Sequence, residues 1–467
     1  MEIDEFSQTF FRMEMEEDFF SWRTPDANPF WDVVRYELFF SLFEKDEPQS
    51  LQNVVASGSL RSKIKKIASV PARVVALTIQ WARMKAMRQV DFLALVASRY
   101  KDVDGRPADH ASIDVLRTFS ELGSIRKIES QPGLLHDVNV NILISGAARV
   151  YRLPSSLEKY LRDMAEAIAD AEQKYFGARD PNLFSVVRRE YTSHLVQRQI
   201  WHEIIERSNP RFILMTQNGI QKGALIEARK RGVPVVECQH GVISRMHPAY
   251  SYPTALQPGE GAVVPDVLLL FSEYWMGQCY MPGTKMLVAG NDRFGNKGIR
   301  STRNGAAVFV TAAFFHKYLS PLAVELARSM PTRAFIMKLH PAQVADQGRI
   351  EEEYRGIQNL SVVGTEKSCS ELFADASDVV IVQSTASYEA LDHGVPVHIL
   401  RQCGYMSHGD LFTHPDVHLF STAAELQGLL FRPVAGKDHG LPFFSAFDPS
   451  AIREISVLHR RGTGVVA

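Results

Sequence analysis

Histidine, hydroxyl and amide side chains gather at the points where predicted β-strands end. A buried strand with the sequence VVEC is followed by Gln239, His240 and Gly241. In the second half of the chain, the predicted strands ending KLHP (338–341) and VQST (382–385) carry similar groups. In an open parallel sheet, ligands bind beyond the carboxyl ends of the strands. Because few carboxylates occur at these ends, we expect the site to bind an anion.

His240 is the residue that we predict to act as a general base. A neutral histidine suits proton removal near pH 7, because its unperturbed pKa is about 6.5. Gly241 would let the backbone turn tightly beside the ring, and Gln239 or Glu237 could orient the imidazole. The alternative is a hydrogen-bonded structural histidine, in which case Glu237 or an acidic residue of the loop 102–109 would be the base. The predicted acceptor-side residues are Gln239, Gly241, Arg245 and His247, of which the last two would meet anionic groups of the acceptor.

The segment VQSTASYEALDHGVP (382–396) predicts a strand followed by a helix. Ser384 and Thr385 fall at the junction, where their hydroxyls and the free amides of the first helical turn could hold a phosphate. Glu389, one turn later, could accept hydrogen bonds from ribose or sugar hydroxyls. The alternative is ordinary N-capping by Ser or Thr with an acidic residue nearby.

His340 is the second predicted catalytic residue. Pro341 ends the strand, so His340 should project at the edge of the sheet and donate to a leaving phosphate, with Lys338 adding charge. A lone histidine at a strand end is more often structural, and the interpretation depends on both motifs occurring in the same half of the chain. The predicted donor-binding residues are Lys338, Pro341, Gln383, Ser384, Thr385, Ser387, Glu389, Asn291 and Arg293. We predict no metal ligands and no cofactor.

Alternating strands and helices must position these groups. From Val90 onward, short apolar strands alternate with helical segments, which predicts parallel sheets with right-handed crossovers. Residues 1–90 read mainly as helix, and PFWDVVRYELFFSLF (29–43) carries apolar side chains around much of its surface. We therefore predict an α/β protein with two Rossmann-like domains facing a cleft. The predicted units are an acceptor-side domain (1–262, with the helical extension 1–90), a second domain (263–445) and a C-terminal helix or tail (446–467), with a hinge near 253–264.

Composition excludes several classes of protein. The 467 residues carry a formal net charge of −1, whereas a dedicated nucleic-acid binder would be basic. The acidic N-terminus does not read as a signal peptide, and no apolar stretch has the length of a membrane helix. The four cysteines are scattered without a CxxC pair, as in a cytoplasmic protein with reduced thiols. The chain has no GxGxxG, GxxxxGK[ST] or GxSxG motif, and we interpret the sequence DVD (102–104) as a surface loop and not as a metal site.

The segment 59–90 is strongly basic. It contains eight Lys and Arg residues and no acidic residue, and it also carries Trp81. A basic amphipathic segment of this kind could rest on the anionic inner face of a membrane or contact an anionic glycan. The alternative is a solvated helix face.

The motifs of the second half resemble those of GT-B glycosyltransferases of bacterial surface polysaccharides. The likeness lies in the HP of residues 340–341, the Ser384-Thr385 pair and the following EALDHGVPV (389–397), and AGNDRFG (289–295) resembles a GNxRxD stretch of such enzymes. It covers about residues 90–400 and is strongest to CMP-sugar users, the sialyltransferases and capsule-type Kdo transferases. CDP-glycerol polyol-phosphate transferases are similar too.

The resemblance implies a GT-B fold in which the second domain binds a nucleotide sugar. It also implies transfer of a 2-keto acid sugar, such as Kdo or a sialic-acid-like sugar, from a CMP-linked donor to a glycan or lipid-linked glycan acceptor. The CMP-sugar families place an acidic residue before the glycine of the first domain, whereas this chain has Gln239-His240-Gly241. The donor therefore stays open. The alternatives are a polyol-phosphate transferase, a GT-B-like UDP-sugar 2-epimerase and a non-catalytic glycan-binding protein.

Overall fold

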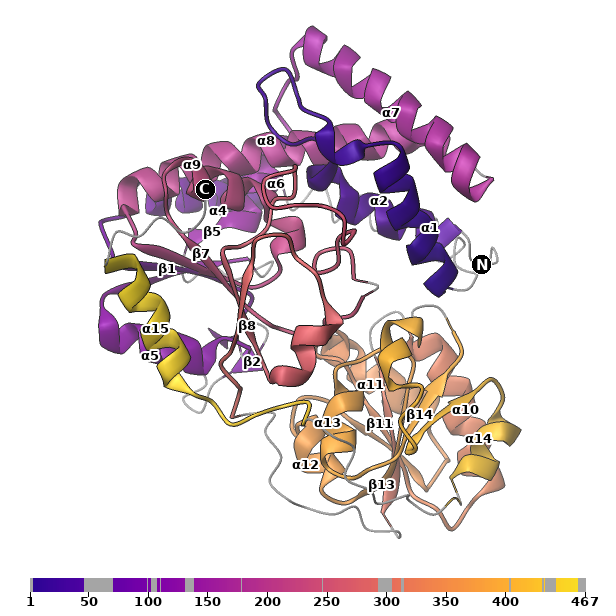
Figure 1. The fold of residues 1–467 in the computed structure, drawn as a ribbon. Helices are drawn as coiled ribbons and strands as arrows, with labels where there is room; N and C mark the ends of the chain where they lie inside the picture. The colour runs from indigo at the N-terminus through magenta and orange to yellow at the C-terminus, as the bar shows by residue number, and fades with distance from the viewer. Residues whose placement is uncertain are drawn as a thin grey trace.

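Two α/β domains, each built around a parallel sheet, make up most of the molecule (Figure 1). The computed structural model describes residues 3–460, apart from 46–69, 99, 102–106, 110, 131–137, 178, 246, 293–304, 312–314, 403–404, 431 and 433–441. The predicted α/β class, with two Rossmann-like domains and a helical N-terminal extension, is confirmed.

The first sheet has the strand order β5-β4-β1-β6-β7-β8-β9, and each neighbouring pair is parallel. Its strands are β1 (Phe92–Val96), β4 (Ile125–Glu129), β5 (Val138–Asn139), β6 (Phe212–Met215), β7 (Val235–Cys238), β8 (Val267–Leu270) and β9 (Lys285–Val288). The strands β1, β6, β7 and β8 are buried along their whole length, as expected of a parallel sheet that is covered on both faces. A short antiparallel pair, β2 (Tyr100–Lys101) and β3 (Pro107–Ala108), follows β1.

The second sheet has the order β12-β11-β10-β13-β14-β15 and is also parallel throughout. Its strands are β10 (Ala306–Val310), β11 (Phe335–Lys338), β12 (Leu360–Val363), β13 (Ala376–Ile381), β14 (Val397–Leu400) and β15 (Val417–Phe420). Its helices are α10 (His316–Ser329), η5 (Pro341–Asp346), α11 (Gln347–Glu353), α12 (Cys369–Phe373), α13 (Ala386–Asp392), η6 (Tyr405–Leu411) and α14 (Ala423–Leu429).

Helices of different lengths cover the first sheet and form the N-terminal extension. These are α1 (Ile3–Glu16), η1 (Phe19–Ser21), α2 (Trp31–Lys45), α4 (Val70–Lys85), α5 (Ile113–Leu122), α6 (Val140–Ala148), α7 (Ser155–Phe176), α8 (Leu183–Ser208), η3 (Asn218–Ile220), α9 (Lys222–Lys230) and η4 (Glu273–Gln278). The helix α8 packs against α2, α6, α7 and α9. As predicted for residues 29–43, α2 is buried on more than one side, because the consecutive residues 31–35, which go around the helix, are all buried.

Arg35 of α2 ties the extension to the first domain. Its guanidinium forms a buried ion pair with Glu14 of α1 and also donates to the backbone oxygens of Pro248 and Ser251, the latter at 2.9 Å. The side chains of Arg35 and Glu14 are 1% and 0% exposed. A charge with so little contact with water needs such partners, since an unpaired buried ion costs several kcal/mol. The helical extension is therefore an integral part of the first domain.

The boundary between the two sheets lies later in the chain than predicted. The strands β8 and β9 pair in parallel with the first sheet, so the chain leaves it after Val288 and not at residue 262, and the predicted hinge segment 253–264 lies inside the first domain. The repeated pattern of strands and helices could not reveal this, because it does not specify which sheet a strand joins.

The C-terminal helix returns to the first domain. The helix α15 (Pro449–Arg460) lies beside α5 (Figure 1), with Ile452 and Ile455 buried in the first domain's core. Where the chain comes back, Gly290 has φ +70°, and a β-carbon there would lie 2.0 Å from the Ala446 carbonyl oxygen. The segments that leave and re-enter the first domain therefore run in contact at Gly290, a position that only glycine fits.

Candidate active site between the two domains

The strand ends that carry the predicted chemistry meet where the two domains face each other. His240 and Gly241 directly follow β7 of the first domain, and Ser384 and Thr385 connect β13 to α13 of the second. A β-carbon built on Gly241 would lie 3.5 Å from the Thr385 hydroxyl oxygen. We call the four residues His240, Gly241, Ser384 and Thr385 the interdomain site.

A chain of buried hydrogen bonds orients His240. The Tyr250 hydroxyl lies 3.2 Å from Nδ1 of His240 and donates to Oε1 of Glu237 at 2.7 Å. The backbone N–H of Asn218 donates to the same carboxylate oxygen at 3.1 Å. Tyr250 has one hydroxyl hydrogen, so when this hydrogen is donated to the Glu237 carboxylate, the Tyr250 oxygen accepts from Nδ1–H of His240. Nε2 of His240 then carries the lone pair, which is the form that a base requires.

Burial keeps the Tyr250 hydroxyl in its protonated form. Tyr250 is 1% exposed, and burial raises its pKa well above the usual range for a phenol, so it stays protonated and can donate. Glu237 is fully buried, which raises the pKa of its carboxyl group, while the bonds from Tyr250 and Asn218 act in the opposite direction. His240 itself is only half-buried. The imidazole is therefore held on its Nδ1 side by Tyr250, and the residue keeps partial contact with solvent.

Gln239 and Gly241 have roles that differ from those predicted. The Gln239 side chain accepts from the Phe271 backbone N–H at 2.9 Å and donates to the Gly241 carbonyl at 3.0 Å, so it joins the end of β7 to the residue that follows β8. Gly241 is not among the glycines with positive φ, so the backbone turn does not require glycine there. Because glycine has no side chain, position 241 leaves space beside the Thr385 hydroxyl.

The two predicted acceptor contacts are engaged elsewhere. Arg245 is exposed and donates to the Gly277 carbonyl at 3.2 Å. His247 packs against the Tyr250 ring at 4.8 Å, and its Nδ1 accepts from the Ala249 amide at 3.2 Å. Burial lowers the pKa of His247 to about 4, so it is neutral near pH 7. His247 therefore supports Tyr250 and cannot act as a cation for an anionic acceptor.

The Ser384-Thr385 junction is held by its own backbone contacts. The Ser384 amide donates to Nε2 of His408 at 3.0 Å, and the Ala386 amide donates to the Ser384 hydroxyl at 3.2 Å. Ser387 is fully buried and donates to the Ser384 carbonyl at 2.8 Å. The expectation that free helical amides hold a phosphate is therefore wrong for these two amides. The Thr385 hydroxyl remains as the group that faces Gly241.

His340 lies on the same edge of the second sheet as Ser384, two strands away. The order β11-β10-β13 puts the two strand ends about 10 Å apart at the usual strand spacing. Gln343 fixes the turn after β11, because its side chain accepts from the His340 amide at 3.3 Å and from the Thr311 hydroxyl at 2.7 Å. His340 is half-buried, as are Gln383 and Glu389, while Pro341 begins η5.

Two predicted donor-binding residues have their hydrogen-bond partners away from the interdomain site, and a third lies outside the described residues. Lys338 is buried, and its ammonium group donates to the Leu339 and Gly364 carbonyls inside the second domain. Asn291 is buried beside the segment that returns to the first domain, and its backbone N–H donates to the Ser445 carbonyl at 2.9 Å. Arg293 lies outside the described residues, as do the acidic residues 102 and 104 of the DVD sequence.

Aromatic and acidic side chains hold the domains together next to the site. Tyr274 of η4 and Tyr388 of α13 both donate to Asp410, the latter at 2.9 Å. The Phe443 carbonyl accepts from the Trp275 indole at 2.7 Å, and the rings of Trp275 and Tyr388 lie 4.8 Å apart. Sequence analysis missed these residues together with Tyr250 and His408. All of them lie in short helices or irregular segments, where no periodic pattern marks a buried polar group.

Within the described residues, no group of three or more His, Cys, Asp or Glu side chains is placed to hold a metal ion. The donor set of the interdomain site consists instead of an imidazole and hydroxyls. These groups can take up a proton and hydrogen-bond to an anion.

No family model matches the chain, and no curated protein matches it. Among solved structures, UDP-GlcNAc 2-epimerase from Methanocaldococcus jannaschii is similar at 11% identity with a TM-score of 0.46, over 79% of this chain and 99% of that one. The glycotransferase of kitacinnamycin is similar at 13% identity (TM-score 0.44; 80% and 95% covered), and spinosyn rhamnosyltransferase at 12% (0.42; 80% and 96%). At such identities, no residue role or substrate is carried over from these proteins.

The substitution Tyr250→Phe tests the orientation of His240. It removes the acceptor for Nδ1–H and one partner of the buried Glu237, so we expect the free energy of unfolding to fall by about 1–3 kcal/mol. In ring-¹⁵N NMR spectra at pH 8, His240 should change from the Nδ1–H tautomer to a mixture. Tyr280→Phe is the control, because that hydroxyl donates to the Leu256 carbonyl. An unchanged tautomer in Tyr250→Phe would show that Tyr250 does not orient the imidazole.

The burial of His408 predicts how the stability of the fold depends on pH. Burial lowers its pKa to about 3, so the folded protein keeps it neutral while the unfolded chain takes up a proton at about pH 6.5. The unfolded state therefore binds more protons between these values, and stability is lost as the pH falls below about 6.5. His408→Gln, which can still accept from the Ser384 amide, should lose less stability than the wild type between pH 7.5 and 5 in urea unfolding. Parallel losses in the two proteins would contradict this role.

Proposed function

We propose that the chain is a glycosyltransferase that moves a sugar from a nucleotide-linked donor to an acceptor hydroxyl at the interdomain site. One observation carries the proposal: His240, whose Nδ1 lies 3.2 Å from the Tyr250 hydroxyl, directly precedes Gly241, and a β-carbon on Gly241 would lie 3.5 Å from the Thr385 hydroxyl oxygen of the other domain. A base from one domain and anion-binding groups from the other are what transfer between two bound substrates needs.

The chemical step uses these groups in separate roles. Nε2 of His240 removes the proton of the acceptor hydroxyl as its oxygen bonds to the anomeric carbon. The bond between that carbon and the phosphate oxygen of the donor breaks, and the electron pair leaves with the nucleotide. Hydrogen bonds from Ser384, Thr385 and His340 stabilise the charge that develops on the departing phosphate. Glu389 contacts ribose or sugar hydroxyls.

We further propose that the donor is a CMP-linked 2-keto acid sugar, Kdo or a sialic-acid-like sugar, and that the acceptor is a glycan or lipid-linked glycan. The support is the sequence resemblance in the HP pair and in the Ser384-Thr385 pair, which lie on one edge of the second sheet. Side-chain donors would take the part that a metal ion has in other transferases, so catalysis should persist in EDTA.

Donor binding and transfer can be separated by substituting His240. We expect His240→Ala to bind CMP in calorimetry like the wild type, while transfer falls by about 10² to 10⁴, the usual contribution of a positioned base. His202→Ala, at an exposed position of α8, is the control and should transfer normally.

Each rival function predicts a different outcome in the same assays. A 2-epimerase would convert a UDP-sugar with no acceptor present, and a polyol-phosphate transferase would consume CDP-glycerol. A glycan-binding protein would show no turnover at all. Full transfer activity in a folded His240→Ala protein that still binds CMP would exclude His240 as the base.

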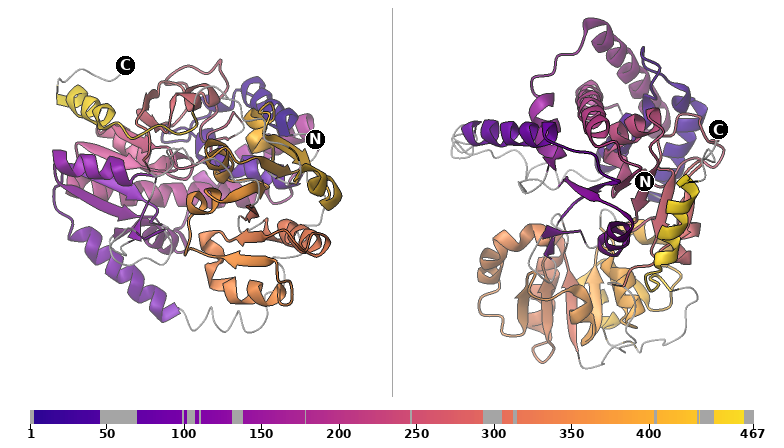
Figure 2. Two further views of the ribbon diagram at one scale, coloured as in Figure 1. Left: turned by 90° about the horizontal axis from the view of Figure 1, so that it is seen from below. Right: turned by 90° about the vertical axis from the view of Figure 1, so that its left-hand side faces the viewer.

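We also propose that α4 brings the protein to an anionic membrane surface. Figure 2 shows this helix extending from the first domain, and it exposes Val74, Val75 and Ile79 next to Arg73. Residues 59–69 of the basic segment lie outside the described residues. In the described part of the chain, no helix is both long and apolar enough to cross a bilayer, so the proposed contact is peripheral.

Liposome sedimentation tests this contact. We expect salt-sensitive binding to vesicles with anionic lipid, weakened at least tenfold by Val74→Ser with Val75→Ser, because two apolar side chains then no longer insert. The control is Val150→Ser, at a residue that is 79% exposed outside α4. Equal binding by the double variant and the control would identify α4 as a solvated helix.

A further inference from the structure

The helix η6 of the second domain contacts both the first domain and the segment that follows β13. Its residue Asp410 accepts a hydrogen bond from Tyr274 of the first domain and another from Tyr388 of α13 at 2.9 Å. Two residues earlier, Nε2 of His408 accepts from the backbone N–H of Ser384 at 3.0 Å. One short helix therefore joins a contact between the domains to the interdomain site.

The carboxylate of Asp410 depends on the two phenols that donate to it. Burial raises the pKa of Asp410, whereas the hydrogen bonds from Tyr274 and Tyr388 act in the opposite direction. Burial also raises the pKa of both tyrosines above the usual range for a phenol, so both hydroxyls stay protonated and can donate. The ring of Phe443 packs 4.7 Å from Tyr274 and 5.1 Å from Tyr388. In such an apolar setting, a lost donor leaves a carboxylate poorly compensated.

His408 holds Ser384 although its other ring nitrogen is unsupported. Its side chain is fully buried, and burial lowers its pKa to about 3, so the ring is neutral near pH 7. Since Nε2 accepts from Ser384, Nδ1 carries the hydrogen, and among the described residues this N–H has no hydrogen-bond partner. An unsatisfied buried donor destabilises the conformation that contains it. The position of His408 therefore depends on the other contacts of η6, which include those of Asp410.

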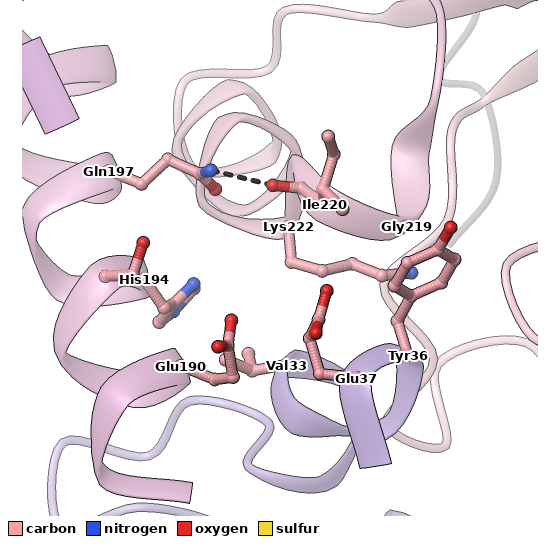
Figure 3. A pocket seen from close by; sticks show the side chains of 10 residues that line it. Val33, Tyr36, Glu37, Glu190, His194, Gln197, Gly219, Ile220 and Lys222 are labelled. Carbon is pink, nitrogen blue, oxygen red and sulfur yellow. Dashed lines mark hydrogen bonds between the residues drawn. The ribbon is translucent and has the colours of Figure 1, made fainter. Parts of the chain in front are cut away.

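His194 of the first domain also lacks hydrogen-bond partners for its ring within the described residues, but its surroundings differ. Figure 3 shows its ring beside a cavity of about 130 Å³ between α2, α8 and η3. This volume has room for roughly four water molecules at liquid density, so the His194 ring can be hydrated in place. The ring of His408 lies instead 5.6 Å from the ring of Tyr388. Of the two, His408 is the histidine whose position depends on neighbouring helices.

We propose that Tyr274 and Asp410 are positioning residues for the interdomain site and that η6 couples contact between the domains to the shape of the Ser384-Thr385 junction. With the domains in contact, Tyr274 holds Asp410, and η6 keeps His408 on the Ser384 N–H. When the domains separate, Asp410 loses one of its donors and the junction loses this support. The coupling itself does not depend on the reaction. That the junction binds the phosphate of a donor rests on the function proposed above.

Hydrogen–deuterium exchange of the full chain, followed by mass spectrometry, tests the coupling. Tyr274→Phe removes the hydroxyl that reaches Asp410 and keeps an aromatic ring against Phe443. We expect a peptide that covers residues 383–388 to exchange about tenfold faster in this variant, because a hydrogen bond to a charged acceptor is lost. Tyr354→Phe is the matched control, since that hydroxyl donates to Ser320 at 2.9 Å inside the second domain. Its exchange in the same peptide should equal that of the wild type.

A second variant tests whether the two positioning residues act through one contact. Asp410→Asn leaves one acceptor oxygen where the carboxylate has two, so it should accelerate exchange of the same peptide to a similar extent. The double variant Tyr274→Phe/Asp410→Asn should then exchange no more than about twofold faster than either single variant. Effects that multiply in the double variant would contradict a shared contact and overturn the coupling.

Two other results would also overturn the proposal. One is unchanged exchange of residues 383–388 in Tyr274→Phe. The other is equally accelerated exchange in α10, because this would show a general loosening of the second domain and not a coupling through η6.

Calorimetry with CMP separates this proposal from the proposed function. Tyr274→Phe should bind CMP about tenfold more weakly than the wild type, in proportion to the expected exchange, and Tyr354→Phe should bind it normally. If Tyr274→Phe exchanges faster but binds CMP normally, Tyr274 is not a positioning residue for the donor. If the wild type itself does not bind CMP while the exchange results are as expected, the coupling stands and the proposed donor is wrong.

Discussion

The buried guanidinium of Arg35 is the contact on which the first domain's side of the site depends. It joins Glu14 of α1 to the backbone oxygens of Pro248 and Ser251, on either side of the segment that carries Tyr250. Removing one member of such a buried pair usually costs about 3–5 kcal/mol. The contact of Arg35 with Glu14 and with the segment 248–251 is therefore strong. The N-terminal helices thus hold the segment that carries Tyr250. Tyr250 in turn orients the imidazole of His240, the proposed base at the end of β7.

A second constraint sets the distance between the domains. The chain leaves the first domain after β9 and returns through Phe443, whose carbonyl is held by Ser272 and Trp275. Asp410 accepts hydrogen bonds from Tyr274 of the first domain and from Tyr388 of the second. These contacts bring the Thr385 hydroxyl to Gly241, so the proposed chemistry depends on residues that touch no substrate.

The sequence predicts the two parallel sheets and the strand ends that meet, because apolar strand runs and strand-end polar residues are local signals. It does not predict the boundary after Val288, since β8 and β9 look the same whichever sheet they join. Tyr250 and His408 could not be found either, because each acts through a contact across irregular backbone. Residue type and position after predicted strands indicate ligand contacts for Lys338, Asn291 and His247, whereas burial gives them structural partners instead.

The central claim is that the ends of β7 and β13 form one site, and an engineered disulfide tests it most directly. A β-carbon on Gly241 would lie 3.5 Å from the Thr385 hydroxyl oxygen, close to the spacing that a disulfide needs. The pair Gly241→Cys/Thr385→Cys should therefore cross-link within the chain under mild oxidation, detected by mass spectrometry after proteolysis, while either single variant does not form this bond. If a folded double variant stayed unlinked under conditions that oxidise exposed thiols, the two strand ends would not face each other and the account would be wrong.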